Sequence, residues 1–211
     1  MHKSISTAVT AIEAIHVPGN RILIAVAGPP ATGKSTFSDA LVQALNERNY
    51  LASCVVPMDG YHLDNLQLDR LGLMHVKGAP ETFDFNGLRC LLERLRVART
   101  LEYYPIFYRE RDLAISGAGA VLSDTEIIIV EGNYLMLDSA PWNDLAQFFD
   151  IEFFLETAEA RIKQRLVDRW LAYGYDQAGA QARALSNDIP NMKLVLGNVR
   201  ASTKAHFIQA D

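Results

Sequence analysis

One short stretch limits the folds open to this chain more than any other. Residues 28–35 read Gly-Pro-Pro-Ala-Thr-Gly-Lys-Ser, which matches the pattern G-x-x-x-x-G-K-[ST]. The apolar run 21–27 just before it has the length of a buried strand, and the segment 35–48 is predicted to be a helix. Glycines let the backbone turn its N–H groups toward a phosphate, and the start of a helix adds the positive end of its dipole. The sequence therefore predicts a phosphate-binding loop at this junction.

The loop is expected to bind ATP together with Mg²⁺. Lys34 would reach the β- and γ-phosphates, the Ser35 hydroxyl would take one position on Mg²⁺, and Thr36 would face the α-phosphate. The alternative is a glycine-rich turn that matches the pattern by chance, and the strand and helix on either side argue against it. The predicted nucleotide contacts of the loop are Gly28, Pro29, Pro30, Ala31, Thr32, Gly33, Lys34, Ser35 and Thr36.

Strand-like apolar runs alternate with longer amphipathic segments along the rest of the chain. The further predicted strands are 51–58, 127–130 and 148–155. The further predicted helices are 4–15, 86–99 and 157–173, the last capped by Thr157. This alternation favours an α/β fold, a three-layer sandwich with a mostly parallel central sheet, known as the P-loop NTPase fold. Because no linker interrupts the pattern, we expect a single domain over residues 1–211.

Composition excludes several classes of protein. With 49% hydrophobic and 21% charged residues, the chain has the make-up of a packed globular protein. Its net charge of −5 provides no general attraction for nucleic acid or an anionic membrane, so neither is an expected partner. The two cysteines, Cys54 and Cys90, are expected to be core thiols, being too few for a disulfide framework or a zinc site. No signal-peptide or membrane-spanning run is evident, so the cytoplasm is the expected compartment.

Two acidic residues follow apolar strands, at the sheet edge where ligands bind in open α/β folds. Asp59 is a candidate general base for the hydroxyl of an acceptor, the alternative being a turn or cap residue. Glu131, followed by Gly132, resembles the acid that helps to order Mg²⁺, the alternative being a carboxylate turned to solvent. The predicted metal-site residues are therefore Ser35, Asp59 and Glu131.

Four segments together resemble one known superfamily. After the loop 28–35 come Pro-Met-Asp-Gly-Tyr-His-Leu-Asp-Asn at 57–65, Lys-Gly-Ala-Pro-Glu-Thr-Phe-Asp at 77–84 and Val-Glu-Gly-Asn at 130–133. In order and spacing they are similar to the uridine kinase, pantothenate kinase and phosphoribulokinase superfamily, and most similar to bacterial proteins described as fructose transport system kinases. The resemblance implies that Asp59 is catalytic. It also implies acceptor contacts from Tyr61, His62, Lys77 and Asp84, each of which has an ordinary structural alternative. Asp84 stands between two aromatic residues, where a carboxylate needs a partner such as a substrate hydroxyl or a cation.

The resemblance also implies a helical lid around residues 157–190. Arg161, Arg165 and Arg169 lie on one face of the predicted helix, where an arginine can close over the phosphates. Arg169 is the first candidate for this role and for catalysis, and Arg165 is the second candidate. Both are expected to contact the nucleotide, the alternative being a solvated helix face. By the same resemblance the adenine would bind near residues 198–202.

One segment departs from the pattern of these relatives. Where many of them have Pro-x-aromatic-Asp, this chain reads Pro-Ile-Phe-Tyr-Arg at 105–109. Tyr108 and Arg109 are therefore expected to contact an acceptor of different charge, such as a phosphorylated sugar. The alternative is that 109–112 is a solvated run of charges.

These features favour an ATP-dependent kinase that transfers the γ-phosphoryl group to a hydroxyl of a small metabolite. A sugar, a nucleoside, a pantothenate-like compound and a sugar phosphate all remain open as the acceptor. The alternatives are a nucleotide-dependent regulatory ATPase or switch without an acceptor, and a sensor that only binds its ligand. A guanine-nucleotide switch is disfavoured because the chain has no N-K-x-D motif. A homodimer is a further expectation from the resemblance.

Overall fold

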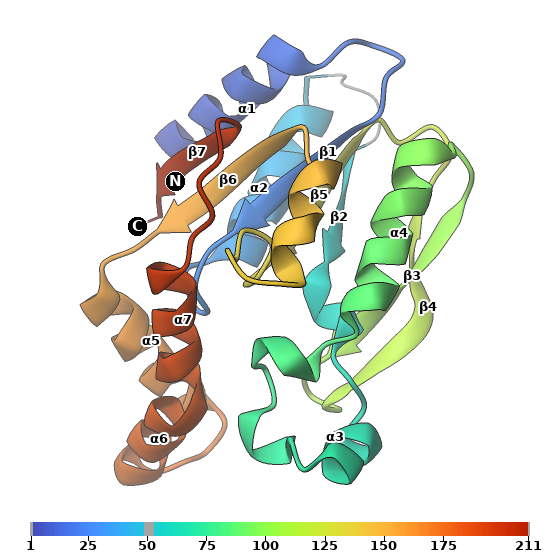
Figure 1. Ribbon diagram of the computed structural model, residues 1–211. Helices are drawn as coiled ribbons and strands as arrows, with labels where there is room; N and C mark the ends of the chain where they lie inside the picture. Colours follow the sequence, from blue (N-terminus) through green and yellow to red (C-terminus); the bar gives the residue numbers. More distant parts are fainter. Residues whose placement is uncertain (1, 49–52, 211) are drawn as a thin grey trace.

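The central element of the computed structural model, which describes residues 2–48 and 53–210, is a five-stranded sheet (Figure 1). Its strand order is β2-β5-β1-β6-β7 and every neighbouring pair is parallel. The strands are β1 (Ile22–Ala27), β2 (Ser53–Pro57), β5 (Ile127–Gly132), β6 (Ile151–Glu156) and β7 (Ala205–Gln209). The predicted α/β class with a mostly parallel sheet is confirmed. Leu51 and Ala52, at the start of the predicted second strand, lie outside the described residues.

Helices cover both faces of this sheet, so the side chains of β1 are buried on both sides. Leu23, Ala25 and Ala27 pack into one core cluster, which also contains residues of α4 (Phe85–Val97) and α7 (Ile189–Gly197). The alternate residues of β1 pack into a second cluster with α1 (His2–Ile15) and α2 (Lys34–Asn46). The alternation of side chains along a strand thus produces the three layers of the sandwich.

A separate antiparallel hairpin lies beside α4, formed by β3 (Glu102–Tyr108) and β4 (Leu113–Val121) (Figure 1). The hydroxyl of Tyr104 donates a 2.8 Å hydrogen bond to the carbonyl of Val55 in β2. The hairpin also packs closely on η1 (Met58–Tyr61), the 3₁₀ turn that follows β2. A Cβ on Gly60 would lie only 1.9 Å from the carbonyl oxygen of Pro105, so only glycine fits there. The hairpin is therefore fixed against the turn that carries Asp59.

Short helical elements complete the edge of the sheet where the strands end. α3 (Asn65–Leu71), η2 (Met74–Val76) and η3 (Pro80–Thr82) follow η1 on one side of this edge, and η4 (Trp142–Phe148) precedes β6. On the other side lie α5 (Glu159–Ala172), α6 (Gln177–Arg183) and the π-helical turn η5 (Ala184–Asp188), which leads into α7 (Figure 1). Among the described residues, no helix is long and apolar enough to cross a membrane.

Several local predictions were wrong. Residues 148–150, expected to begin a strand, precede β6, and Phe148 ends the turn η4. Thr157 does not cap α5, because the residue before that helix is Ala158 and the Thr157 hydroxyl donates to the carbonyl of Ala210. Cys90 is exposed, since the buried face of α4 is formed by its leucines. Cys54 is partly buried, and burial raises the pKa of its thiol to about 11.

Candidate active site

The phosphate-binding pattern forms a loop between the end of β1 and the first turn of α2. Gly33, the residue before α2, has φ of +90°, a conformation that glycine adopts without strain. It provides no side-chain cap, so the first N–H groups of α2 keep their hydrogen-bonding capacity for an anion. The structure therefore gives this loop the local geometry that phosphate binding requires.

Lys34 lies within the loop rather than in solvent. Its side chain is buried, and Nζ donates a 2.8 Å hydrogen bond to the carbonyl of Pro29. Burial lowers the pKa of Lys34 to about 8, and the opposing charges of Glu131 and Asp59 limit that shift. A lysine held this way is poorly solvated and ready to exchange a carbonyl for a phosphate oxygen.

Ser35 and Glu131 meet at the base of the site. The hydroxyl of Ser35, in the first turn of α2, donates a 3.1 Å hydrogen bond to Oε1 of Glu131 at the end of β5. Burial, with the negative charge of Asp59 as the second cause, raises the pKa of Glu131 to about 7. Oxygen donors beside a phosphate loop suit Mg²⁺, which usually takes one or two protein oxygens and completes its shell with phosphate and water. Among the described residues, no group of three acids, histidines or cysteines is placed to hold a metal ion.

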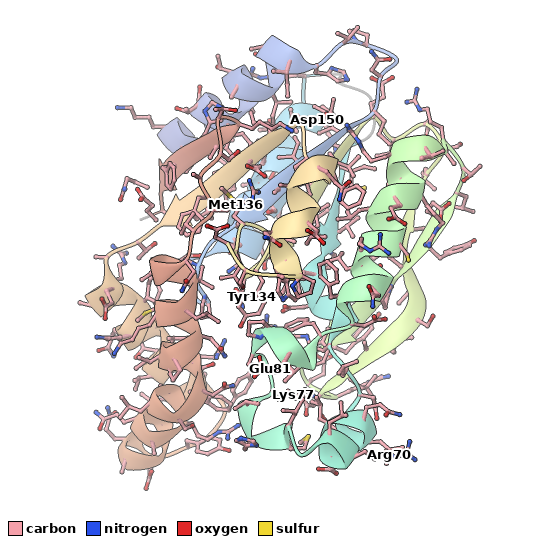
Figure 2. The ribbon with its side chains drawn as sticks, viewed as in Figure 1. Arg70, Lys77, Glu81, Tyr134, Met136 and Asp150 are labelled. Atoms are coloured by element: carbon pink, nitrogen blue, oxygen red, sulfur yellow. The ribbon has the colours of Figure 1, made fainter. Side chains whose placement is uncertain are left out.

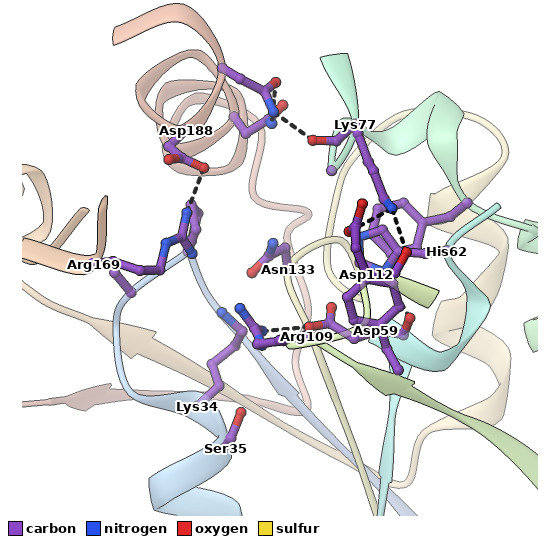
Figure 3. Close-up of a pocket in the computed structure, with 18 of the residues that line it drawn as sticks. Lys34, Ser35, Asp59, His62, Lys77, Arg109, Asp112, Asn133, Arg169 and Asp188 are labelled. Atoms are coloured by element: carbon purple, nitrogen blue, oxygen red, sulfur yellow. Dashed lines mark hydrogen bonds and ion pairs between the residues drawn. The ribbon is translucent and has the colours of Figure 1, made fainter. Parts of the chain in front are cut away.

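These residues open into a cavity of about 630 Å³ (Figure 3). The phosphate loop forms one side, η1 and the β3–β4 hairpin a second, and α5, α6 and η5 a third. The predicted site residues that line the cavity are Pro30, Ala31, Gly33, Lys34, Ser35, Thr36, Asp59, His62, Lys77, Arg109, Glu131 and Arg169. The structure thus brings most of the predicted phosphate contacts to one cavity, together with the predicted acceptor contacts His62, Lys77 and Arg109.

Asp59 is held from two directions. Nη2 of Arg109 lies 2.7 Å from Oδ2 of Asp59, and Nδ1 of His62 lies 2.7 Å from the Asp59 carbonyl oxygen. Because a carbonyl only accepts, Nδ1 of His62 carries the proton. The ring of His62 packs between those of Phe83 and Phe107, with centroids 4.1 and 4.6 Å away. Burial lowers the pKa of His62, which favours the neutral ring and leaves Nε2 as an acceptor.

Lys77 joins three parts of the acceptor side. Its Nζ donates to Asn65 Oδ1 at 2.6 Å and to Asp112 Oδ1 at 2.7 Å, and lies over the ring of Phe107. Its carbonyl accepts a 2.6 Å hydrogen bond from Nδ2 of Asn187, in the turn η5. Figure 2 shows Lys77 at the lower end of the molecule, between α3 and the turn that contains Glu81. The hydrogen bond from Asn187 therefore connects the backbone at Lys77 to η5, on the opposite side of the cavity.

The predicted lid arginines have different surroundings. Arg169 faces the cavity, with Nη2 2.7 Å from Oδ1 of Asp188, whose other oxygen accepts from the indole of Trp170 at 2.6 Å. Arg165 donates to the carbonyl of Ala31 at 3.2 Å and lines a second cavity, of about 320 Å³, on the other side of the loop. Arg161 is exposed and lines neither cavity.

Other predicted contacts lie outside the main cavity. Tyr61 is buried in the core, which raises the pKa of its phenol, and Tyr108 packs on the guanidinium of Arg111. Asp84, expected to bind a substrate or a cation, instead caps α4 by accepting a 2.8 Å hydrogen bond from the N–H of Gly87. Gly28 and Pro29 shape the loop without lining the main cavity, while Thr32 lines the smaller one.

Residues 198–202, the expected adenine site, line neither cavity. The guanidinium of Arg200 instead forms an ion pair with the buried Glu152. The backbone N–H of Arg200 donates to the carbonyl of Met136.

Several cavity residues were not among the predicted contacts: Asp112, Asn133, Trp170 and Arg183. Asn187, Asp188 and Asn191 also line the cavity, and for their segment the sequence had left open a helix cap or a ligand role. Asn133 lay within the Val-Glu-Gly-Asn segment, and an Asn-Asp-Ile-Pro-Asn segment at 187–191 was a visible polar cluster. Asp112 gave no local signal, because its role depends on the hairpin.

The sequence model of the Phosphoribulokinase / Uridine kinase family matches residues 23–191. "Uncharacterized protein YggC" of Escherichia coli (strain K12) is 34% identical over 204 residues, covering 95% of this chain and 83% of that protein. "Putative uridine kinase C227.14" of Schizosaccharomyces pombe is 32% identical over 187 residues, covering 85% of this chain and 80% of that protein. The crystal structure of a "putative fructose transport system kinase" from Silicibacter sp. TM1040 has a TM-score of 0.90 and 39% identity, covering 96% of this chain and 98% of that one.

Proposed function

The chain belongs to the Phosphoribulokinase / Uridine kinase family of P-loop kinases, and from this premise we propose that it transfers the γ-phosphoryl group of ATP to a hydroxyl of a small metabolite. The observation that carries the proposal is that Lys34 and Asp59 line the same cavity (Figure 3). A phosphate-binding lysine and a carboxylate in one cavity suit a reaction in which a hydroxyl oxygen meets a phosphorus atom between them.

ATP would extend across the loop from one cavity to the other. Ala31, Gly33 and Thr36 line both cavities, so a single elongated ligand could contact both. The triphosphate would take the N–H groups at the start of α2 and the Nζ of Lys34. The nucleoside would lie in the smaller cavity, beside Arg165 and the end of β7 at Gln209.

The metal would be held on the oxygen donors at the base of the main cavity. Ser35 and Glu131 fit that role, since their side chains are already hydrogen-bonded next to the loop. Mg²⁺ bound there would neutralise charge on the β- and γ-phosphates. Asp59, the third predicted metal-site residue, lies in the same cavity, where a water molecule can join its carboxylate to that ion.

Asp59 would receive the proton of the acceptor hydroxyl. As the hydroxyl oxygen forms its bond to the γ-phosphorus, the bond from that phosphorus to the β–γ bridging oxygen breaks, and ADP leaves. Lys34 and Arg169 would stabilise the charge on the migrating group, because both are cations in the cavity wall. A general base of this kind contributes roughly 10²- to 10⁴-fold to the rate.

A regulatory ATPase has no need of the acceptor side of this cavity. His62, Lys77 and Arg109 extend the wall away from the phosphate loop, which gives room for a second substrate. The test is ADP release in ATP and Mg²⁺ across pantothenate, nucleosides, pentose phosphates, fructose and other sugars. The proposal expects release that depends on one acceptor class and disappears in Asp59→Asn, with the exposed α3 variant Asp69→Asn as the control. Slow release that no acceptor changes would favour the regulatory ATPase.

A further inference from the structure

Arg109 occupies one oxygen of the carboxylate that is proposed to receive the acceptor proton. Among the residues that the structure describes, Asp59 Oδ2, at 2.7 Å, is the one hydrogen-bond partner of its guanidinium. More than half of the Arg109 side chain, 55%, is exposed, so most of its five N–H donors are available to a ligand. Figure 3 shows Arg109 near Lys34 and extended toward Asp59, inside the cavity.

The turn that carries Arg109 is fixed by the residue three positions later. Asp112 adopts φ of +53° and accepts from Asn65 Nδ2 at 2.9 Å and from Lys77 Nζ at 2.7 Å. These two bonds attach the hairpin turn to the acceptor side of the cavity. The position of Arg109 beside Asp59 is therefore set by packing and hydrogen bonds, whereas its neighbour Arg111 points to the ring of Tyr108 and lies outside the cavity.

Every acid of the cavity wall in the described part of the chain already has a partner. The four acids are Asp59, Asp112, Glu131 and Asp188. Asp112 is held by Lys77 and Asn65, Glu131 by Ser35, and Asp188 by Arg169 and Trp170. If Arg109 leaves Asp59, the described cavity wall therefore offers its guanidinium no other unpaired acid.

We propose that the acceptor brings this missing acid: its phosphorylated hydroxyl lies near a carboxylate or phosphate group, which draws Arg109 away from Asp59 and binds it. This inference rests on the proposed function, because it names the acceptor class of the same site. A guanidinium binds either anion with two parallel hydrogen bonds, which a neutral hydroxyl cannot offer. Arg109 then has two successive partners, Asp59 in the free protein and the acidic group in the complex. A neutral acceptor can use the other oxygen of Asp59, but it offers the guanidinium of Arg109 no anion.

The first experiment uses pairs of acceptors that differ mainly in the acidic group. Pantothenate with pantothenol tests a carboxylate, while ribulose 5-phosphate with ribulose and fructose 6-phosphate with fructose test a phosphate. ADP release and the mass of the phosphorylated product are measured for the wild type, Arg109→Gln and the control Arg111→Gln. We expect the acidic member of one pair to be preferred, and Arg109→Gln to lower its kcat/KM about 100-fold, mainly through KM. Arg111→Gln should keep the wild-type preference.

The second experiment needs no turnover. The same compounds are titrated calorimetrically into protein saturated with a non-hydrolysable ATP analogue and Mg²⁺. We expect an acidic compound to bind the wild type and Arg111→Gln, and to bind Arg109→Gln at least about tenfold more weakly. The carboxylate and phosphate pairs show which of the two groups Arg109 recognises.

The outcomes separate the two proposals. Acidic compounds that bind through Arg109 without any acceptor-dependent ADP release would support the inference and count against the kinase reaction with these acceptors. A neutral acceptor that is used as well as its acidic partner would leave the kinase standing and overturn the inference. Equal effects of Arg109→Gln and Arg111→Gln, or acidic compounds that do not bind even to the wild type, would also overturn it.

Discussion

The hydroxyl of Ser35 donates a 3.1 Å hydrogen bond to Oε1 of Glu131, which joins the first turn of α2 to the end of β5. If these two side chains hold Mg²⁺, Glu131→Gln should raise the Mg²⁺ concentration needed for half-maximal ADP release by roughly 10- to 100-fold, because an amide is a weaker partner for the ion or its water than a carboxylate. A Mg²⁺ titration checks this, with Glu110→Gln in the exposed hairpin turn as the control. An unchanged Mg²⁺ requirement would remove Glu131 from the metal site.

The same carboxylate predicts how stability depends on pH in the nucleotide-free protein. Burial raises the pKa of Glu131 from 4.5 to about 7, so between these values the folded protein binds more protons than the unfolded chain. The free energy of unfolding contributed by this group therefore falls as pH rises through that window, by roughly 3 kcal/mol. Glu131→Gln should flatten the decrease. Denaturant unfolding of the wild type and variant at pH 5 and pH 8 measures it, and equal pH dependence would contradict the burial argument.

Lys34 allows its catalytic and structural contributions to be separated. Because the ammonium is buried and burial lowers its pKa to about 8, the charge itself does not stabilise the empty fold. Lys34→Met keeps the apolar stem, so we expect the melting temperature to stay the same or rise. Phosphoryl transfer should fall by roughly 10²-fold or more, since the variant loses charge stabilisation on the phosphates. Thermal unfolding and ADP release with the accepted substrate test both parts, and a full rate would exclude this loop from the reaction.

Local sequence order was enough to predict the phosphate loop and the two acids. β1, the loop and α2 follow one another directly, so their relation needs no long-range information. Asp59 and Glu131 each follow a strand, and β2 and β5 are parallel neighbours, so both acids reach the same edge. In such cases a short segment determines the position of its own functional side chain.

Long-range packing and local competition explain what the sequence did not reveal. The contact between Arg109 and Asp59 joins residues 50 positions apart in the sequence. It depends on the β3–β4 hairpin packing against Gly60, which is possible only because glycine has no Cβ. Asp84 was predicted to bind a ligand, but its carboxylate accepts from the N–H of Gly87. An Asp directly before a helix readily caps that helix, a competing role that was not predicted. Burial of Lys34 likewise depends on residues from several elements that no single motif describes.

The close contact at Gly60 predicts the stability of the hairpin attachment. Gly60→Ala would place its Cβ 1.9 Å from the Pro105 carbonyl oxygen, so β3 would have to move away from η1. We expect the free energy of unfolding to fall by about 2–3 kcal/mol, in the range of overpacking substitutions. Gly197→Ala is the control, since its added Cβ meets nothing within 4 Å. Denaturant unfolding compares the two, and equal stabilities would show that the hairpin is not held at this point.

Arg165 and Arg161 lie four positions apart on α5 and provide a matched pair for the nucleoside site. Arg165 lines the smaller cavity and bonds to the carbonyl of Ala31, whereas Arg161 is exposed. If the nucleoside occupies that cavity, Arg165→Ala should raise the Kd for ATP by roughly tenfold, because a charge-assisted contact to the nucleotide is lost. Arg161→Ala should leave it unchanged. Calorimetric titration of both variants decides the matter, and equal affinities would place the nucleoside elsewhere on the loop.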